Sequence, residues 1–425
     1  MTTVSVTADD RLIEAVLGDL AASPSPYHAV ARAAALLDEA GFTGLDPAEG
    51  WPDVDRGYVA QGGSLVAWHT PQMVLPPNGF AIVGAHTDSP NLRLKPNADT
   101  GAVGWKQLAV EVYGGVLVNS WLDRDLGVSG RLVLRGGEMR LVRVERALAR
   151  IPQLAIHLDR EVTDRGLLLD KQQHLTPIWG LGAPSAGEFA EFVAAEAGVT
   201  PGEVVAWELM LHDLTPPARL GRNGELVASA RIDNLYSSFC AVRALAAAGP
   251  GRRTAVVALF DHEEVGSAST TGAAGPVLEG VLERLVPGGG RAEVRRAYAA
   301  SACVSADMAH GVHPNYAERH EPGHRPVPNG GPVVKVNANQ RYATDAVTAG
   351  WFVECCERAR VPHQVFVSRN NMPCGSTIGP ITATRLGIPT VDVGGAMLSM
   401  HSARELAGAR DVAFLTAAFG EFFVS

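Results

Sequence analysis

Apolar residues are grouped in two different ways along this chain. Before about residue 95 and after about residue 229, short apolar runs such as "FAIVGA" and "TAVVALF" alternate with longer amphipathic segments. The runs are typical of interior strands, whereas "PYHAVARAAALLDEAGF" and "DNLYSSFCAVRALAAAG" are typical of helices. Ser25 is the expected N-cap of the first helix and Gly41 its expected stop. This alternation predicts an α/β sheet flanked by helices.

Between about residues 96 and 228, helical patterns are sparse and short β-type segments dominate. "GVLVNSW", "RLVLRGGEMRLVRVE" and "VVAWELMLHDL" are examples, and "RGGE" favours a hairpin turn. The simplest organisation is a discontinuous α/β domain over residues 1–95 and 229–425, with a β-rich domain inserted at residues 96–228. A length of 425 residues also fits two domains.

Residues that can ligate a metal ion follow several of the apolar runs. In open α/β sheets, ligands bind at the C-terminal ends of the strands, so these side chains are expected to meet. They offer only imidazole and carboxylate groups, which suits zinc, manganese or cobalt and excludes a thiolate site. The residues are His86, Asp88, Asp233, Asp261, His262, Glu263, Glu264, Asp307, His310 and His401.

Taken one at a time, most of these residues have an ordinary structural explanation. Asp233 before a helix is a common N-cap, Asp307 could cap a loop, and Glu263 with Glu264 could form a solvated turn. His401 could cap a helix in "SARELAGA". Taken together, strand after strand would have to end in a ligand-type residue by coincidence, so a metal site is the better interpretation.

Spacing indicates how the roles could divide. His86 and Asp88 lie on the same side of an extended segment, so the carboxylate can accept the second imidazole N–H and orient the ring. Glu263 and Glu264 are adjacent and would point apart on a regular strand, so one can ligate while the other faces a bound water. A two-metal site needs a shared carboxylate between ions roughly 3.5–4 Å apart and a base near the water. This set of residues is large enough for both.

Composition narrows the class of protein. The net charge of −9 and the lack of a basic block argue against nucleic-acid binding. Five scattered cysteines without a CxxC pair indicate reduced thiols in the cytoplasm. The N-terminal residues lack the pattern of a signal peptide, and no apolar run approaches the ~20 residues of a membrane span. We therefore expect a soluble cytoplasmic protein that binds neither membrane nor nucleic acid.

Two rival chemistries fit the residues less well. Cys374 and Ser376 in "MPCGST" are candidate nucleophiles, but Cys374 has no base beside it in the sequence. A glycosidase would need two carboxylates on either side of a sugar, and adjacent glutamates rarely reach that separation.

Seven motifs in the chain resemble the M18 metallopeptidases, the aspartyl aminopeptidase family. In order, they are "GAHTDSPNLRLKP", "ARIDNL", "DHEEVGS", "SADMAHGVHPNY", "KVNANQRYATDA", "MPCGSTIGP" and "SMHSARE". Each is moderately specific, and the ordered set is highly specific. The resemblance extends from about Pro24 to the C-terminal helix.

The resemblance implies a metallo-exopeptidase-type α/β catalytic domain, an inserted β-rich dimerisation domain, and dimer-based dodecamers. It also implies two zinc ions per subunit, with Glu263 as the general base and Asp88 orienting His86. Manganese or cobalt would suit the same ligands. The implied ligands are Asp233 as the bridge, His86 and Asp307 on one ion, and Glu264 and His401 on the other.

The resemblance also implies a substrate pocket. His310 would lie near the scissile carbonyl, Lys335 would pair with an acidic substrate side chain, and Tyr342 would line the same region. His157, from the inserted domain, would reach into a neighbouring subunit's active site, and it is a second-ranked alternative as a metal ligand. Asn371 stands where the family more often has Asp, which removes a charge near the pocket and bears on fine specificity.

The expected reaction is hydrolysis of the N-terminal peptide bond of a peptide, with a preference for Asp or Glu at the first position. The metals would activate a water, and Glu263 would carry its proton to the leaving amine. Two alternatives remain. A deacylase could use the same metals, although Lys335 and His310 favour the aminopeptidase. A catalytically silent assembly or cargo shell would tolerate change at Glu263, whereas this chain carries every expected ligand.

Overall fold

The computed structural model describes residues 8–71, 79–286 and 288–425. Within these residues the chain forms three sheets and divides into two compact units. Unit 1 comprises Met1–Asp88, Pro217–Met400 and Glu405–Ser425, and unit 2 comprises Ser89–Pro216 and His401–Arg404. Most of unit 2 is therefore one continuous insertion into unit 1. That residues 96–228 form a separate domain, with boundaries at these positions, remains a prediction.

Unit 1 is built on a mixed sheet that has nine strands among the described residues. Its four inner neighbours β13, β4, β14 and β18 run parallel, while β3 and β16 beside them are antiparallel. The order across the sheet is β1 (Thr43–Gly44), β2 (Arg56–Gln61), β3 (Ser64–His69), β13 (Thr254–Phe260), β4 (Phe80–His86), β14 (Ala302–Ala306), β18 (Thr390–Gly394), β16 (Val333–Val336) and β17 (Gln364–Val367).

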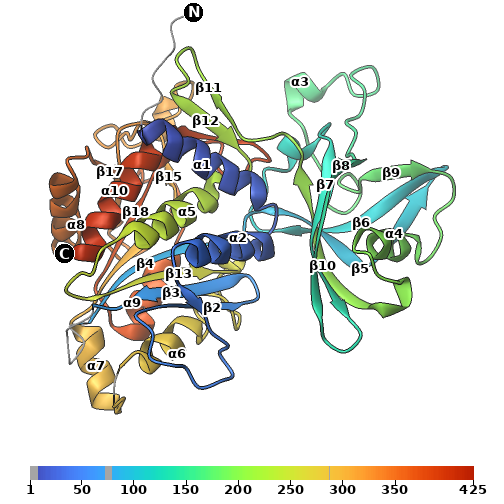
Figure 1. Cartoon of the computed structure of the whole chain (residues 1–425). Coiled ribbons are helices and arrows are strands. Elements are labelled where there is room, and N and C mark those ends of the chain that lie inside the picture. Colours follow the sequence, from blue (N-terminus) through green and yellow to red (C-terminus); the bar gives the residue numbers. More distant parts are fainter. Residues whose placement is uncertain (1–7, 72–78, 287) are drawn as a thin grey trace, which may run out of the picture. The chain divides into compact units, whose positions relative to one another are not determined.

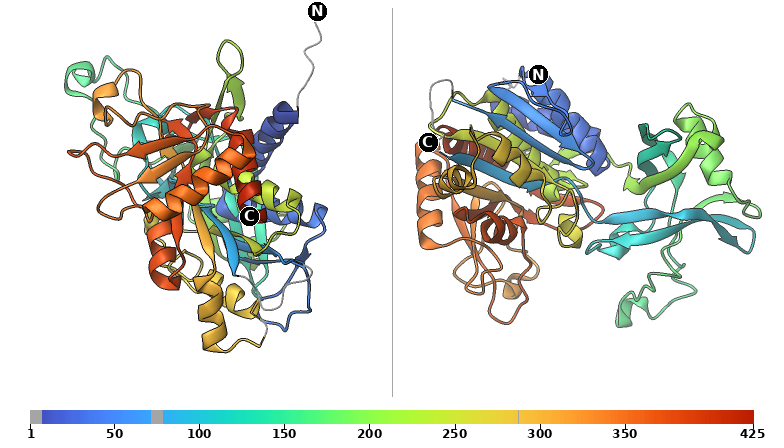
Figure 2. Two further views of the ribbon diagram at one scale, coloured as in Figure 1. Left: turned by 90° about the vertical axis from the view of Figure 1, so that its left-hand side faces the viewer. Right: turned by 90° about the horizontal axis from the view of Figure 1, so that it is seen from below.

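Every residue of β4 and β13 is buried, because helices cover both faces of the sheet. Ala81 and Val83 pack in the larger core and Phe80 and Ile82 in the smaller one, as the two-residue period of a strand requires. Figures 1 and 2 show these layers of unit 1. The helices of the larger core are α1 (Ala8–Ala22), α2 (Pro26–Glu39), α5 (Ile232–Ala247), α8 (Ala346–Ala359) and α10 (Asp411–Val424), and those of the smaller core are α6 (Val277–Arg284), α7 (Arg291–Ala299) and α9 (Ile378–Leu386).

Several local predictions are confirmed and one is wrong. Ser25 caps α2 by accepting a hydrogen bond from the backbone N–H of His28 at 3.4 Å, and the expected α/β alternation is present. The segment proposed as a helix after His401 instead forms β20 (Glu405–Gly408). Pairing with β12 and β19 holds these residues extended, so tertiary contacts override the helical pattern. The other strands of this smaller sheet are β11 (Ala218–Leu220), β12 (Leu226–Ser229), β19 (Ala396–Leu398) and β15 (Ala309–His310).

Unit 2 has its own antiparallel sheet and its own hydrophobic core. The helix α4 (Glu188–Glu196) contributes Phe189, which packs edge-on against Trp179 and Trp207. The expected turn at "RGGE" joins β7 to β8. The strands in spatial order are β8 (Met139–Ala149), β7 (Leu126–Leu134), β10 (Val204–Asp213), β5 (Asn91–Ala102), β6 (Trp105–Tyr113) and β9 (Ile178–Leu181), and a short helix α3 (Val162–Arg165) lies in the loop before β9.

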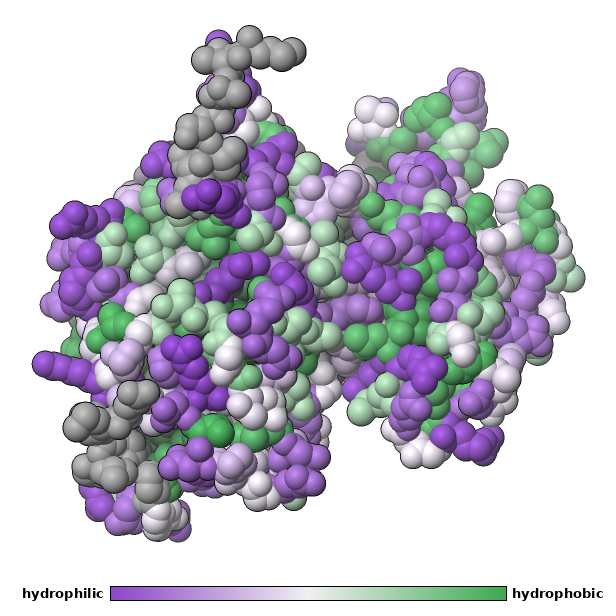
Figure 3. Space-filling view, in the orientation of Figure 1, coloured by the Kyte–Doolittle hydropathy of each residue, from purple (hydrophilic) through white to green (hydrophobic). Residues whose placement is uncertain are grey.

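Among the described residues, no helix combines the length and the apolar character needed to cross a bilayer. On the face drawn in Figure 3, polar and apolar side chains are interspersed.

Candidate metal centre

The carboxyl ends of the parallel strands in unit 1 deliver acidic and imidazole groups to one edge of the sheet. His86 is the last residue of β4, Glu263 and Glu264 lie in a 3-10 helix just after β13, and Asp307 follows β14. Asp233 lies at the start of α5, which comes after β12. Ligand atoms of His86, Asp233 and Glu264 all lie within 4.8 Å of one another. The structure therefore brings these three predicted ligands together.

His86 is oriented so that Nε2 faces the acidic groups. Its Nδ1 lies 2.9 Å from the backbone oxygen of Asp88. A carbonyl can only accept, so Nδ1 carries a proton, and Nε2 is the nitrogen that would offer its lone pair to a metal ion once it loses its own proton. Nε2 lies 3.5 Å from Oδ1 of Asp233 and 3.9 Å from Oε2 of Glu263. A neutral imidazole held in this tautomer is the form that ligates a metal ion.

The Asp88 carboxylate is predicted from its spacing to contact the ring of His86, but its main contacts are with the backbone of Glu263 and Glu264. Its two carboxylate oxygens accept the backbone N–H groups of Glu263 and Glu264, each at 3.1 Å. The nearest approach of Nδ1 of His86 to that carboxylate is 3.4 Å. Asp88 is completely buried, and it binds the 3-10 turn as an N-terminal cap would. Asp88 thus holds the histidine mainly through its backbone oxygen and the two glutamates through its carboxylate.

Two hydrogen bonds that the sequence does not predict hold the start of α5, where Asp233 lies. The N–H of Asp233 donates to Oε2 of Glu405 at 3.0 Å, and the side-chain amide of Asn234 donates to the backbone oxygen of Ala306 at 2.7 Å. The second bond ties the start of α5 to the end of β14, directly before Asp307. Glu405 is buried. In the sequence, the sign of a special role for Glu405 is that this acid begins the short apolar run "ELAG".

The cluster holds more negative charge than its surroundings can stabilise alone. Burial, followed by the charges of neighbouring acids, raises the pKa of Glu263 to about 8 although His86 opposes this. Burial and the charge of Asp233 raise the pKa of Glu264 well above its ordinary value. Burial likewise raises the pKa of Asp307 to about 6 against the pull of Lys335. Buried like charges of this kind require protons or a cation.

His86 responds to the same charges. Burial by itself disfavours the imidazolium form, but hydrogen bonds to Asp233 and Asp88 raise the pKa of His86 well above its usual value. The donor set of one imidazole and several carboxylates, buried and crowded, fits a divalent ion such as zinc. Glu263 keeps 15% of its side chain exposed, so it is open to water.

Lys335 and Tyr342 lie beside Asp307. Lys335 is only 2% exposed, and its Nζ lies 3.9 Å from Oδ2 of Asp307 and 3.3 Å from the backbone oxygen of Met308. The same ammonium lies 5.1 Å from the centre of the Tyr342 ring, which is cation–π distance. Lys335 is therefore an interior charge rather than a solvated lysine at a strand edge.

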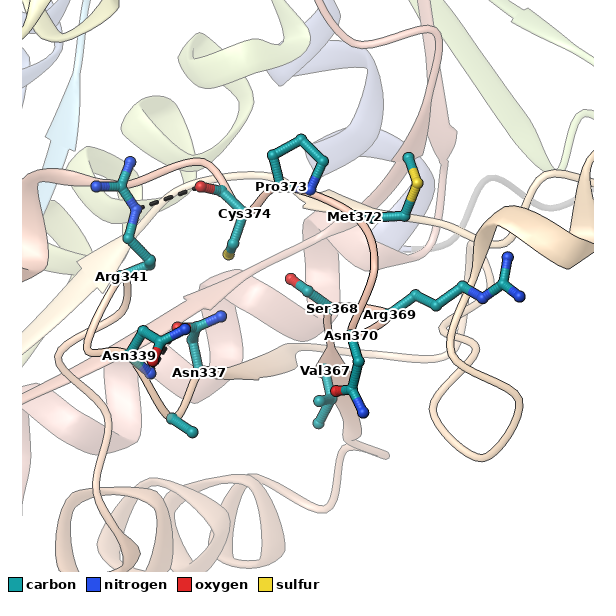
Figure 4. A pocket seen from close by; sticks show the side chains of 11 residues that line it. Asn337, Asn339, Arg341, Val367, Ser368, Arg369, Asn370, Met372, Pro373 and Cys374 are labelled. Atoms are coloured by element: carbon teal, nitrogen blue, oxygen red, sulfur yellow. Dashed lines mark hydrogen bonds between the residues drawn. The ribbon is translucent and has the colours of Figure 1, made fainter.

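Two adjoining cavities lie next to this group. The first, of about 210 Å³, is lined by His310, Tyr342 and Phe366 among others. The second, of about 320 Å³, lies between residues 337–341 and residues 367–374. Figure 4 shows Cys374 and Arg341 on the wall of this second cavity. Nε of Arg341 donates a hydrogen bond to the backbone oxygen of Cys374 at 3.2 Å. Both cavities share the wall formed by Val367, Ser368, Arg369, Met372, Pro373 and Cys374.

The remaining predicted residues are found in other settings. His401 and His157 belong to unit 2. Nδ1 of His401 lies 3.0 Å from the backbone oxygen of Gly115 and donates to it, which leaves Nε2 for other contacts. His157 is exposed in a turn. Asn371 is exposed and lines neither of the two cavities. The roles of these three residues remain predictions.

Comparison with protein families gives one match over nearly the whole chain. Residues 20–423 match the family described as aminopeptidase I zinc metalloprotease (M18). A probable M18 family aminopeptidase 2 from Streptomyces coelicolor is 56% identical over 411 residues, covering 95% of each chain. A protein of the same name from Mycobacterium leprae is 50% identical, covering 95% of this chain and 96% of the relative.

Solved structures share the fold. Ape4, solved in complex with Nbr1, superposes with a TM-score of 0.93 at 35% identity, over 99% of this chain and 87% of that one. The mApe1 dodecamer of S. cerevisiae gives 0.85 at 29% identity, over 98% and 96%. An M18 aminopeptidase from Thermotoga maritima gives 0.87 at 23% identity, over 98% and 96%, which supports the fold alone.

Asp88→Asn should weaken zinc binding by about 10–100-fold, the usual effect of losing a group that orients metal ligands. The amide keeps only one acceptor oxygen and so cannot hold both N–H groups of the turn. Competition with a chromogenic chelator measures the affinity, with the exposed Asp53→Asn as control. Equal affinities in wild type and Asp88→Asn would show that the carboxylate does not position the ligands.

The metal-free protein should become less stable as pH rises from about 5.5 to about 8. The folded pKa of Glu263, about 8, lies above its ordinary value of 4.5, so the folded state binds the extra proton between these values. That stabilisation is present at the lower pH and is lost as pH approaches 8. The raised pKa of His86 acts in the same direction. Urea unfolding in excess chelator measures the free energy of unfolding at each pH. If its dependence on pH is the same in Glu263→Gln as in the wild type, Glu263 is not the group that binds the extra proton.

Proposed function

Since the chain belongs to the M18 family of zinc aminopeptidases, we propose that it removes N-terminal residues from peptides at the cluster around His86 and Glu263, using two divalent metal ions. The observation that carries this is the convergence of ligand atoms of His86, Asp233 and Glu264 within 4.8 Å, with Glu263 beside them and partly open to water. The raised pKa values of the acids support a cation at this place.

The proposed ligand assignment follows the family motifs. His86 and Asp307 would hold one ion, Glu264 and His401 the other, and Asp233 would be shared. Zinc fits this set best, and manganese or cobalt could replace it. Bound metal would lower the pKa of a water and polarise the scissile carbonyl.

Glu263 is the proposed base because it is partly open to water, whereas Glu264 belongs to the group of converging ligand atoms. Burial raises the pKa of Glu263 to about 8 in the metal-free protein, and nearby cations would lower that value, leaving a carboxylate ready to accept a proton. Glu263 would take the proton of the attacking water and pass it to the leaving amine, a role worth typically about 10²–10⁴-fold. Asp88, through the two N–H groups of the turn, holds Glu263 in place.

The proposed preference for an N-terminal Asp or Glu rests on Lys335. A buried ammonium next to Tyr342, which lines the first cavity, would favour a substrate carboxylate and disfavour an apolar side chain. His310 lines that cavity and would lie near the scissile carbonyl, where it would stabilise the developing oxyanion. His157 would come from a second subunit.

Assembly and location are part of the same proposal. One solved relative is a dodecamer, and unit 2 would supply the dimer contacts of a similar assembly in the cytoplasm. A deacylase on the same metals remains the alternative activity, because Glu263 would serve both reactions. A silent shell is less favoured because Glu263 and the neighbouring ligand-type residues are all present.

Glu263→Gln should abolish most of the activity while the metal remains bound. We expect a fall in kcat of about 10²–10⁴-fold from loss of the base, with close to two ions per chain by elemental analysis. Hydrolysis of Asp-, Glu- and Leu-initiated peptides is compared with that of N-acyl amino acids, and the exposed Glu283→Gln serves as control. Undiminished hydrolysis in Glu263→Gln would remove it as the base, and hydrolysis of acyl substrates alone would favour the deacylase.

Lys335→Met should reduce kcat/KM for Asp-initiated peptides by roughly 30-fold or more relative to Ala-initiated ones. Loss of one partner of a buried charge pair costs about 2 kcal/mol or more, and an Ala side chain makes no such pair. The ratio of the two kcat/KM values is the measurement, because it is independent of the fraction of active protein. An unchanged ratio would show that another residue reads the acidic side chain.

A further inference from the structure

Asp392 is a fully buried carboxylate in the middle of β18, in the otherwise apolar run "TVDVGG". It lies outside the metal cluster and was not among the predicted site residues. A buried charge in a central strand is costly unless several donors satisfy it. The identity of those donors shows what Asp392 does.

Three separate segments donate to the Asp392 carboxylate. Oδ1 accepts the hydroxyl of Ser305 from β14 at 2.6 Å and the hydroxyl of Thr377 at 2.5 Å. Oδ2 accepts the backbone N–H of Ala343 at 2.6 Å. The backbone N–H of Asp392 also donates to the hydroxyl of Thr344 at 2.8 Å. Both oxygens are thus engaged, and the three donors favour the ionised form of the carboxylate.

Two of these donors lie in the segments that supply the cavity walls, although they do not line the cavities themselves. Ala343 directly follows Tyr342, which lines the first cavity and contacts Lys335. Thr377 follows the shared wall by three residues in the chain, since Cys374 is the last residue that lines both cavities. It caps α9 by accepting the N–H of Gly379 at 3.3 Å. Asp392 therefore ties the Tyr342 segment and the shared wall to one point on the rigid sheet.

The Asp392 carboxylate lies so close to Gly379 of α9 that there is no room for a side chain at this position. A Cβ added to Gly379 would lie 2.4 Å from Oδ2 of Asp392. The glycine is not in the left-handed region of backbone space, so its role is to leave room. Replacing it would displace the carboxylate without altering any of its donors.

We propose that Asp392 is the positioning residue of the substrate pocket. It acts through Ala343 and Thr377, and so decides where Tyr342 and the shared cavity wall lie relative to Lys335. Its loss would leave the metal cluster intact but loosen the pocket. This inference rests on the proposed function for its link to substrate, whereas its structural part does not.

Four variants test the proposal in the full-length, zinc-loaded protein. Asp392→Asn leaves one acceptor oxygen, so either Ala343 or the two hydroxyls lose their partner. Thr377→Val removes one donor, with Thr377→Ser as the conservative rescue. Gly379→Ala places a methyl group where the Asp392 carboxylate lies and so displaces that carboxylate. The exposed Asp345→Asn in the same loop is the matched control for Asp392→Asn, and Gly350→Ala, with open space around its Cβ, is the control for Gly379→Ala.

The first readout does not depend on activity. Cys374 lies on the shared wall and is half-buried, whereas the other four cysteines are buried. Its reaction with a chromogenic disulfide reagent should accelerate roughly five-fold or more in Asp392→Asn, Thr377→Val and Gly379→Ala, because the wall opens locally more often. Thr377→Ser and both controls should react at the wild-type rate. Unfolding midpoints above the assay temperature confirm that the variants are folded.

The second readout is substrate discrimination. The ratio of kcat/KM for Asp- and Ala-initiated peptides should fall about ten-fold or more, mainly through KM, while zinc content stays unchanged. Wild-type Cys374 rates and an unchanged ratio in all three variants would overturn the proposal, as would equal loss of both substrates. If Asp392→Asn fails to fold, Thr377→Val and Gly379→Ala decide the matter. If the wild type cleaves no peptide, the proposed function fails and the Cys374 rates alone decide the inference.

Discussion

Buried negative charge at the carboxyl edge of a parallel sheet is the constraint on which the rest of this structure depends. His86, Glu263, Glu264 and Asp307 reach that edge because β4, β13 and β14 are parallel neighbours. Such a cluster costs free energy in a dry interior unless it is compensated. Asp88 is compensated by two backbone N–H groups and Asp307 in part by Lys335. The raised pKa values of Glu263 and Glu264 indicate that their charge is compensated by protons or by a cation.

Lys335 connects this cluster to a second buried acid. Its charge opposes the effect of burial on the pKa of both Asp307 and Asp392. Asp307 belongs to the metal edge, and Asp392 holds the walls of the cavities through Ala343 and Thr377. The proposed chemistry and the proposed specificity would thus be supported by neighbouring strands, β14 and β18, of one sheet. A site built on strands keeps its geometry better than one built on loops alone.

Much of the candidate site could be inferred from residues that end apolar runs. His86, Glu263 and Glu264 follow β4 and β13, whose continuous burial gives a strong pattern. Asp392 and Glu405 were missed, because an acid within a short apolar strand has no local signature of its partners. The contact of Asp88 with the turn of Glu263 and Glu264 was also missed. It joins residues 175 and 176 positions apart, which no local spacing can report.

The sequence by itself determined the alternation of strands and helices, the ligand chemistry and, through seven ordered motifs, the resemblance to the M18 family. These are properties of residue type and local order. Only the tertiary structure decided which nitrogen of His86 faces the acids, that Lys335 is buried against Tyr342, and that "SARELAGA" contains a strand. Each of these depends on groups brought together from distant parts of the chain. Their energies come from burial and pairing, which exist only once the sheet has formed.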